Sequence, residues 1–352
     1  MTEMSNADEI WMKRCFDLAR RGQGFVSPNP PVGAVLVYDG GLLSEGYHKQ
    51  FGGPHAEVEA IRNVPDELRH LIPYSTLYVS LEPCCITGKT PPCTDLIVRE
   101  HIKDVRISTL DPNPQVAGQG LSYLEQMGIH TRSGILEDEG KLWIRAFTTN
   151  MLQQRPHILL KWAQSLFGYA GMEGKQVWLS DPLTRTWSHQ QRAFSDAILV
   201  GARTVETDDP ALIVRDYPGR SPKRVVYDPN GRLSMGFKVF ADDVDVFYFS
   251  KVSNPKISGS HIHLMHLPEQ EEWSFILREL YRNQIGILLV EGGPYVHKTL
   301  IKAGLWDEAW VIQSSASLAE GIQAPNVTGR KIETFKSGED RVVGIRKENE
   351  SY

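Results

Sequence analysis

His55-Ala56-Glu57, Glu82-Pro83-Cys84 and Thr90-Pro91-Pro92-Cys93 are the three short stretches that decide how this 352-residue chain is interpreted. One imidazole and two thiolates can bind a zinc ion in three positions and leave the fourth tetrahedral position to water. Glu57 stands two residues after the histidine, so its carboxylate can lie beside that water and move protons without binding the metal. The pattern predicts a zinc site with an open position and an adjacent base.

The two thiolate ligands have to be chosen from three neighbouring cysteines. Cys84 and Cys85 are adjacent, and adjacent side chains point apart, so they cannot easily share one ion. We expect His55, Cys84 and Cys93 to bind the metal and Cys85 to be a packed thiol, with Cys85 in place of Cys84 as the alternative. Three cysteines within ten residues suit a metal site in a reducing compartment better than a disulfide framework.

A zinc ion with a neighbouring carboxylate suits hydrolytic deamination, in which water attacks an amidine-like ring carbon and ammonia leaves. In this interpretation Glu57 is the catalytic residue, because it takes a proton from the attacking water and passes it on to the ring nitrogen and the departing amine. The competing interpretation is an exposed helical carboxylate without a role, which the proximity of His55 disfavours.

Strands and helices alternate along the chain, which predicts an α/β layer structure. In the first part, apolar spacing predicts helices at 7–22, 55–64 and 92–100 and strands at 32–37, 42–47, 76–81 and 105–109. In the second part it predicts strands at 157–162, 197–201, 224–227, 244–249 and 285–290 and a helix at 295–303. The length favours two domains, which we place at residues 1–150 and 151–352.

Composition narrows the class of protein. Hydrophobic residues make up 41%, charged residues 23%, and the net charge is −5, which argues against a polyanionic partner. No apolar stretch approaches the ~20 residues that span a bilayer. The first residues lack the basic and apolar regions of a secretion signal. We therefore expect a cytoplasmic protein with no membrane or nucleic-acid partner, and we regard a nucleic-acid deaminase as the weaker alternative.

Residues 1–150 resemble the deaminase domain of the bifunctional riboflavin-biosynthesis deaminase–reductases, which implies a cytidine-deaminase-like fold. The eight residues between Cys84 and Cys93 separate this family from nucleoside and transfer-RNA deaminases, whose gap is typically two. The resemblance implies that Asn29, His48 and Lys89 form the substrate pocket. The matching segments are 27–33 (SPNPPVG), 46–48 (GYH), 55–57 (HAE), 82–84 (EPC), 88–93 (GKTPPC) and 111–118 (DPNPQVAG).

Residues 156–352 resemble the reductase domain of the same family, which implies a dihydrofolate-reductase-like fold. The matches include 178–180 (WLS), 195–201 (SDAILVG), 208–212 (DDPAL) and 290–294 (VEGGP). The residues that the resemblance assigns to NADPH are Ala163, Trp178, Thr204, Asp208, Gly292 and Gly293. Those that it assigns to the reductase substrate are Lys161, Gln176, Arg192, Leu212, Arg215 and Glu291. Surface salt bridges are the alternative role for Arg192 and Arg215.

The implied activity has two steps. The first is zinc-dependent hydrolytic deamination of 2,5-diamino-6-(5-phosphoribosylamino)pyrimidin-4-one. The second is NADPH-dependent reduction of the ribosyl group to a ribityl side chain. The resemblance also implies a homo-oligomer that acts on a phosphorylated aminopyrimidine.

The sequence departs from the family pattern at three places. Cys85-Ile86 stands where Ser-His is common, Phe167 replaces the aspartate of a Ser-Leu-Asp-Gly motif, and Gln176 replaces a frequent serine. Because a large apolar ring is no neutral replacement for a carboxylate, the alternative function is an active deaminase with an impaired or accessory reductase domain.

Overall fold

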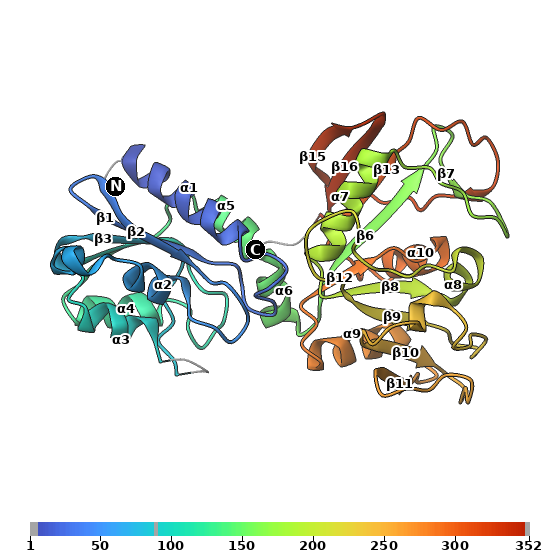
Figure 1. The fold of residues 1–352 in the computed structure, drawn as a ribbon, viewed down its shortest axis with the longest axis horizontal. Helices are drawn as coiled ribbons and strands as arrows, with labels where there is room; N and C mark the ends of the chain where they lie inside the picture. The colour runs from blue at the N-terminus through green and yellow to red at the C-terminus, as the bar shows by residue number, and fades with distance from the viewer. Residues whose placement is uncertain (1–5, 88–90, 349–352) are drawn as a thin grey trace. The chain divides into compact units, whose positions relative to one another are not determined.

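The computed structural model describes residues 6–87 and 91–348, which form two compact units. The first unit ends at Gln154 and the second begins at Arg155. Each unit is built on a sheet of its own (Figure 1). Within the described residues, no helix combines the length and the apolar character needed to cross a bilayer.

The first unit contains a five-stranded sheet in the order β2-β1-β3-β4-β5. Strand β1 pairs antiparallel with β2 and with β3, whereas β3, β4 and β5 are parallel. The parallel strands end at the same edge, so the loops that follow them meet there. The strands are β1 Gly33–Tyr38, β2 Gly41–Tyr47, β3 Thr76–Leu81, β4 Asp104–Thr109 and β5 His130–Arg132.

Helices cover both faces of this sheet (Figure 1). On one face, α1 and α5 pack against Val35, Val37 and Tyr78. On the other face, α2, α3 and α4 pack against the alternate residues of the strands, among them Leu36 and Val79. The helices are α1 Asn6–Arg20, α2 Ala56–Arg62, η1 Asp66–Tyr74, α3 Cys93–Arg99, α4 Gln119–Gln126, α5 Glu137–Trp143 and α6 Arg145–Gln153.

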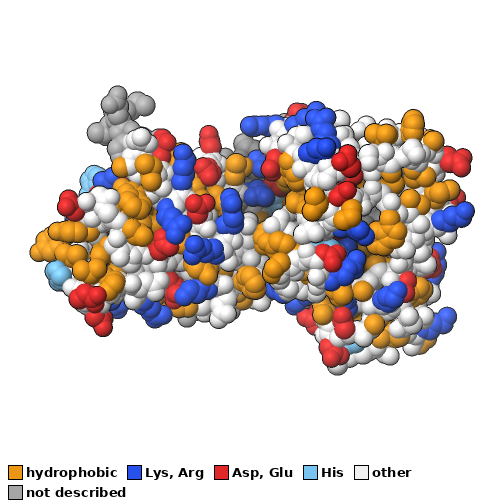
Figure 2. Space-filling view, turned by 45° about the horizontal axis from the view of Figure 1, so that its top comes forward, with side chains coloured by type: hydrophobic (Ala, Val, Ile, Leu, Met, Phe, Trp, Pro, Cys, Tyr) orange, Lys and Arg blue, Asp and Glu red, His pale blue; other side chains and the backbone are white. Residues whose placement is uncertain are grey.

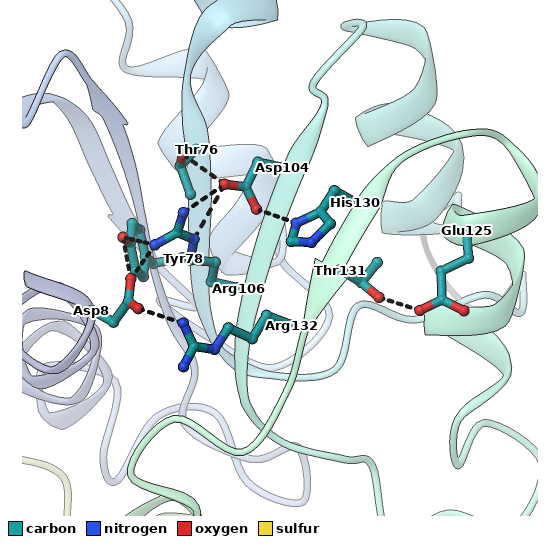
Figure 3. A network of polar contacts seen from close by, with 9 residues as sticks. All are labelled: Asp8, Thr76, Tyr78, Asp104, Arg106, Glu125, His130, Thr131 and Arg132. Atoms are coloured by element: carbon teal, nitrogen blue, oxygen red, sulfur yellow. Dashed lines mark hydrogen bonds and ion pairs between the residues drawn. The ribbon is translucent and has the colours of Figure 1, made fainter. Parts of the chain in front are cut away.

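A network of charged side chains fixes α1 on the sheet (Figure 3). The fully buried carboxylate of Asp8 accepts a hydrogen bond from Tyr78 Oη (2.9 Å) and pairs with Arg106 and with Arg132 Nη1 (3.1 Å). Arg106 also contacts Asp104 (2.8 Å). Burial alone would raise the pKa of Asp8, but Arg106, Tyr78 and Arg132 together bring that pKa below its ordinary value.

The second unit contains a nine-stranded sheet in the order β11-β10-β9-β8-β12-β6-β13-β16-β15. The first seven of these strands are parallel, and the last two form an antiparallel hairpin at the edge. The strands are β6 His157–Gln164, β8 Ala197–Gly201, β9 Lys223–Tyr227, β10 Val246–Ser250, β11 Ile262–His266, β12 Ile287–Val290, β13 Glu308–Gln313, β15 Arg330–Ser337 and β16 Asp340–Arg346. Two short strands, β7 Tyr169–Gly171 and β14 Ile322–Gln323, pair separately.

Its helices also lie on both faces of the sheet. Helices α9 (Glu272–Arg282) and α10 (Pro294–Lys302) cover one face through Ile276, Leu280 and Leu300. Helix α8 (Ala202–Asp208) and the short η2 (Lys238–Phe240) contribute to the core on the other face. Helix α7 (Pro182–Ala193) packs Trp187 against Trp310 and Phe335 near the edge hairpin.

Candidate active sites

Three predicted metal ligands come together in the first unit. His55 is the residue that precedes α2, Cys93 is the first residue of α3, and Cys84 follows β3. His55 Nδ1 lies 3.5 Å from Cys84 Sγ and 3.3 Å from Cys93 Sγ, and the three atoms are within 4.8 Å of one another. In a tetrahedral zinc site, nitrogen and sulfur ligands stand about 3.6 Å apart. The donor set and the spacing therefore fit zinc, bound through Nδ1.

The surroundings favour a thiolate at Cys84, whereas the contact with Cys84 and burial raise the pKa of Cys93. The Cys93 thiol, His55 and the Cys93 backbone N–H lower the pKa of Cys84, although burial opposes them. That N–H donates to Cys84 Sγ at 3.4 Å. Cys85 does not belong to this group among the described residues, and burial raises the pKa of its thiol.

Glu57 lies beside the three donors. It is the second residue of α2, its exposed fraction is 4%, and it lines a cavity of about 340 Å³ together with His55 and Cys84. Burial raises the pKa of Glu57 although the nearby His55 lowers it. A raised pKa makes the carboxylate a stronger base, which favours the uptake of a proton from water.

Asn29 and His48 form a polar edge of the same cavity. His48 Nδ1 lies 2.9 Å from the Pro54 carbonyl, which can only accept, so the proton of the neutral ring is on Nδ1. Nε2 then accepts from Asn29 Nδ2 at 3.1 Å. Burial lowers the pKa of His48 and keeps the ring neutral. The Asn29 carbonyl oxygen is left to accept a hydrogen bond from a ligand.

Glu82, whose role the sequence did not predict, organises the loop after β4. Its buried carboxylate accepts four backbone N–H bonds of 2.9–3.3 Å, from residues 111, 118, 120 and 121. A Cβ on Gly120 would lie 2.3 Å from the Pro83 carbonyl, so this approach requires glycine. The loop brings Asp111 and Asn113 to the cavity wall.

Two further positions of the first unit concern the substrate. Ile86, which stands where the family commonly has histidine, lines the cavity and makes that part of the wall apolar. Lys89, the predicted phosphate-binding residue, lies outside the described residues.

A second cavity, of about 1060 Å³, lies in the second unit. The predicted residues Ala163, Gln176, Trp178, Thr204, Asp208, Leu212, Arg215 and Gly293 line it, as do Lys161, Arg192 and Glu291. Gly292 is the exception among the described residues predicted for this site. A Cβ on Gly292 would lie 2.3 Å from Val200 Cα, so this glycine lets the turn after β12 pass close to the backbone of β8.

Three charged side chains form an ion-pair chain on the wall of this cavity. Glu291 Oε1 lies 2.9 Å from Lys161 Nζ, and Glu291 Oε2 lies 2.6 Å from Arg192 Nη2. Burial alone would raise the pKa of Glu291, but the two cations bring it far below its ordinary value. Burial also lowers the pKa of Lys161, against the effect of Glu291. Arg192 therefore does form a salt bridge, as the alternative role proposed, but its partner Glu291 lines the cavity.

Phe167 and Gln176, the two departures from the family pattern in this unit, differ in their position relative to the cavity. Phe167 has an exposed fraction of 61% and does not occur among the described residues that line the cavity. Gln176 does line it, and its Nε2 lies 3.5 Å from the Asp208 carbonyl oxygen. The departure that motivated an impaired reductase thus lies away from the cavity wall.

Comparison with known families gives two matches. Residues 5–109 match the model described as "Cytidine and deoxycytidylate deaminase zinc-binding region", and residues 156–334 match the "RibD C-terminal domain". The chain is 36% identical over 332 residues to the "Riboflavin biosynthesis protein RibD" of Aquifex aeolicus (strain VF5), covering 93% of this chain and 92% of the relative. It is 35% identical over 318 residues to that of Escherichia coli (strain K12), covering 86% of each.

Solved structures show the same similarity over nearly the whole chain. A diaminohydroxyphosphoribosylaminopyrimidine deaminase/5-amino-6-(5-phosphoribosylamino)uracil reductase from Thermotoga maritima superimposes with a TM-score of 0.89 at 37% identity, covering 97% of this chain and 99% of that one. Acinetobacter baumannii RibD, form 1, gives 0.87 at 30% identity, covering 97% and 98%. These matches confirm the predicted fold class, an α/β chain with a cytidine-deaminase-like first part and the family's reductase fold in the second.

Proposed function

The chain belongs to the RibD family of riboflavin biosynthesis proteins, enzymes with a deaminase and a reductase domain, and on that premise we propose that it catalyses both steps. The deaminase substrate is 2,5-diamino-6-(5-phosphoribosylamino)pyrimidin-4-one, and the reductase converts the ribosyl group of the product to ribityl. The observation that carries the proposal is the convergence of the donors His55, Cys84 and Cys93. Two of these donors line one cavity together with Glu57.

In the first cavity, the chain's own residues bind the ring and move protons. A zinc ion held by His55, Cys84 and Cys93 would supply the Lewis acidity that activates water. Glu57 takes one proton of the attacking water and delivers it to the ring nitrogen. It then carries the second proton, from the hydroxyl group added to the ring carbon, to the amino group, which leaves as ammonia as the carbonyl forms. Asn29, fixed by neutral His48, accepts a hydrogen bond from the pyrimidine edge.

In the second cavity, the ion-pair chain orients the sugar. NADPH, when bound, supplies the hydride. Lys161 is placed by Glu291 to donate a hydrogen bond to the electronegative atom bonded to the carbon that is reduced, and its lowered pKa makes it a better proton donor. Arg215 is a partner for the phosphate, because a guanidinium binds two oxygens at once.

An active deaminase with an accessory second unit is the competing function. The exposed position of Phe167 supports the two-step enzyme instead. On the face drawn in Figure 2, basic and acidic side chains are interspersed, which favours a small-molecule substrate over a polyanion. Cytoplasmic location and homo-oligomerisation stay predictions.

Incubation of the purified protein with the diaminopyrimidine ribosyl phosphate, with and without NADPH, tests the proposal. We expect ammonia and the deaminated ribosyl product without NADPH, and the ribityl product with it, identified by mass. Deaminated product that persists at saturating NADPH would support the accessory function of the second unit. Unchanged substrate in zinc-loaded protein would contradict both.

A further inference from the structure

His189 is a buried histidine of the second unit that the sequence analysis left without a role. It lies on α7, three residues before Arg192, and its exposed fraction is 3%. It lines the large cavity, but its two ring nitrogens face neighbouring protein groups. A buried imidazole needs partners for both nitrogens, so those partners show what the residue does.

Both partners belong to the segment that carries Arg215. The Arg215 backbone N–H donates to His189 Nδ1 at 3.2 Å. Because an amide nitrogen cannot accept, Nδ1 must be unprotonated, and the one proton of the neutral ring is on Nε2. Nε2 lies 3.2 Å from Asp216 Oδ2, which accepts that proton's hydrogen bond.

Asp216 closes the arrangement into a ring of three residues. Its Oδ2 also lies 3.5 Å from Arg215 Nε. A guanidinium has one edge formed by Nε and one Nη, and another formed by the two Nη atoms. Asp216 contacts the group at Nε, so the outer Nη edge can still bind two phosphate oxygens.

We propose that His189 is a positioning residue of the reductase reaction: it fixes the backbone and side chain of Arg215 so that the guanidinium presents its outer edge to the substrate's phosphate. This inference rests on the proposed function, because it takes the phosphorylated ribosyl product as the ligand. A histidine suits the task because its neutral ring accepts from a backbone N–H on one side and donates to a carboxylate on the other.

Two substitutions of His189 separate its hydrogen bond with the Arg215 backbone from its hydrogen bond with Asp216. The Asn side-chain oxygen can occupy the place of Nδ1, so His189→Asn keeps the acceptor for the Arg215 N–H and loses the contact with Asp216. The Gln amide reaches the place of Nε2, so His189→Gln keeps a donor to Asp216 and loses the acceptor. The matched control is Thr186→Ala, an exposed change on the same helix.

The measurement is steady-state reduction of the deaminated ribosyl phosphate at saturating NADPH. We expect His189→Gln to raise KM about tenfold with kcat within about twofold of wild type, because a lost backbone hydrogen bond weakens binding by about this factor. His189→Asn should raise KM less than His189→Gln. The rise should disappear with the dephosphorylated substrate, and in an Arg215→Ala background. Equal KM effects of the two variants, or a rise that persists without the phosphate, would overturn the proposal.

Two controls keep the result unambiguous. NMR of the wild-type imidazole should show the neutral Nε2–H form at pH 7. The Nδ1–H form would overturn the proposal even if the variants did not fold. Wild-type turnover is measured first. A wild type without reductase activity would contradict the proposed function. An active wild type, with the same KM in His189→Gln and His189→Asn, would contradict this inference alone.

Discussion

At the scale of single residues, the first cavity depends on a few side chains that each have a distinct task. Glu57 is buried beside the three metal donors and lines the same cavity as His55 and Cys84. The donors can hold a metal without it. Proton transfer and metal binding should therefore respond to different substitutions.

Glu57→Gln tests the proton shuttle. The amide keeps the volume but cannot take a proton, so ammonia release should fall by about 10²-fold or more. Bound zinc, measured by elemental analysis, should stay near one per chain because the ligands are intact. Glu67→Gln, on the exposed surface of η1, is the control. Undiminished ammonia release would identify another base.

Cys93→Ser and Cys85→Ser test the ligand assignment. Cys93 lies 3.3 Å from His55 Nδ1, so its loss should lower the zinc content sharply, whereas Cys85 is outside the donor group and its loss should not. Metal analysis after dialysis distinguishes the two. A sharp loss of zinc in Cys85→Ser but not in Cys93→Ser would show that Cys85, and not Cys93, binds the metal.

At the scale of elements, buried carboxylates connect segments that are distant in sequence. Glu82 connects the end of β3 to the loop that precedes α4. Asp8 connects α1 to β3, β4 and β5 through Tyr78, Arg106 and Arg132 (Figure 3). Removal of either charge should disturb the connected element more than the fold of the unit.

Glu82→Gln tests the loop anchor. The amide group would point a donor at two backbone N–H groups, and each bond to a charged acceptor contributes about 1.5–3 kcal/mol. We expect faster hydrogen exchange over residues 111–121 and a fall of about 10²-fold in kcat/KM for ammonia release. Zinc content should be retained. The control is Glu139→Gln, an exposed change on α5, and an unchanged exchange pattern would contradict the anchor role.

Asp8→Asn tests the helix anchor. A buried pair that loses one partner costs about 3 kcal/mol. Because the pKa of Asp8 is lowered in the folded state, its contribution is complete above the unfolded value of about 3.9 and is lost as the pH falls through the folded pKa. The difference in unfolding free energy between wild type and variant should be full at pH 7 and shrink below about pH 4. A constant difference would exclude a charge-dependent role.

The helices and strands that the sequence predicted occur close to their predicted residues because their signals are local, but α4, α7, α9, β5, β11 and β13 were not predicted. Strands 76–81 and 197–201 occur at the predicted residues. The hairpin of β15 and β16 was not predicted. The glycine at position 338 was the available sequence signal, because its φ of +59° at the turn is a conformation that favours glycine. The tasks of Glu82 and His189 could not be predicted, because their partners lie 26 to 39 residues away and are brought near only by packing.

At the scale of the whole molecule, the two candidate-site cavities have no lining residue in common among the described residues. Each cavity lies in one compact unit. Each unit also has its own hydrophobic core on both faces of its sheet. Loss of one activity should therefore leave the other intact.

Glu291→Gln tests this separation. The variant leaves Lys161 and Arg192 next to a neutral group, so both side chains should move from their positions on the cavity wall. Reduction of the deaminated substrate should therefore fall by about 10²-fold. Ammonia release in the same preparation should match wild type. Glu57→Gln should show the opposite pattern. Parallel loss of both activities in either variant would reveal dependence between the units.

The lack of shared lining residues between the two cavities also affects how such a chain can evolve. A substitution such as Phe167 or Ile86 can accumulate in one half without a compensating change in the other, because no side chain in the described part of the chain lines both pockets. What the covalent connection secures is stoichiometry: every translated polypeptide carries one copy of each catalyst. The cell then makes the two in a fixed one-to-one ratio, however far either half diverges.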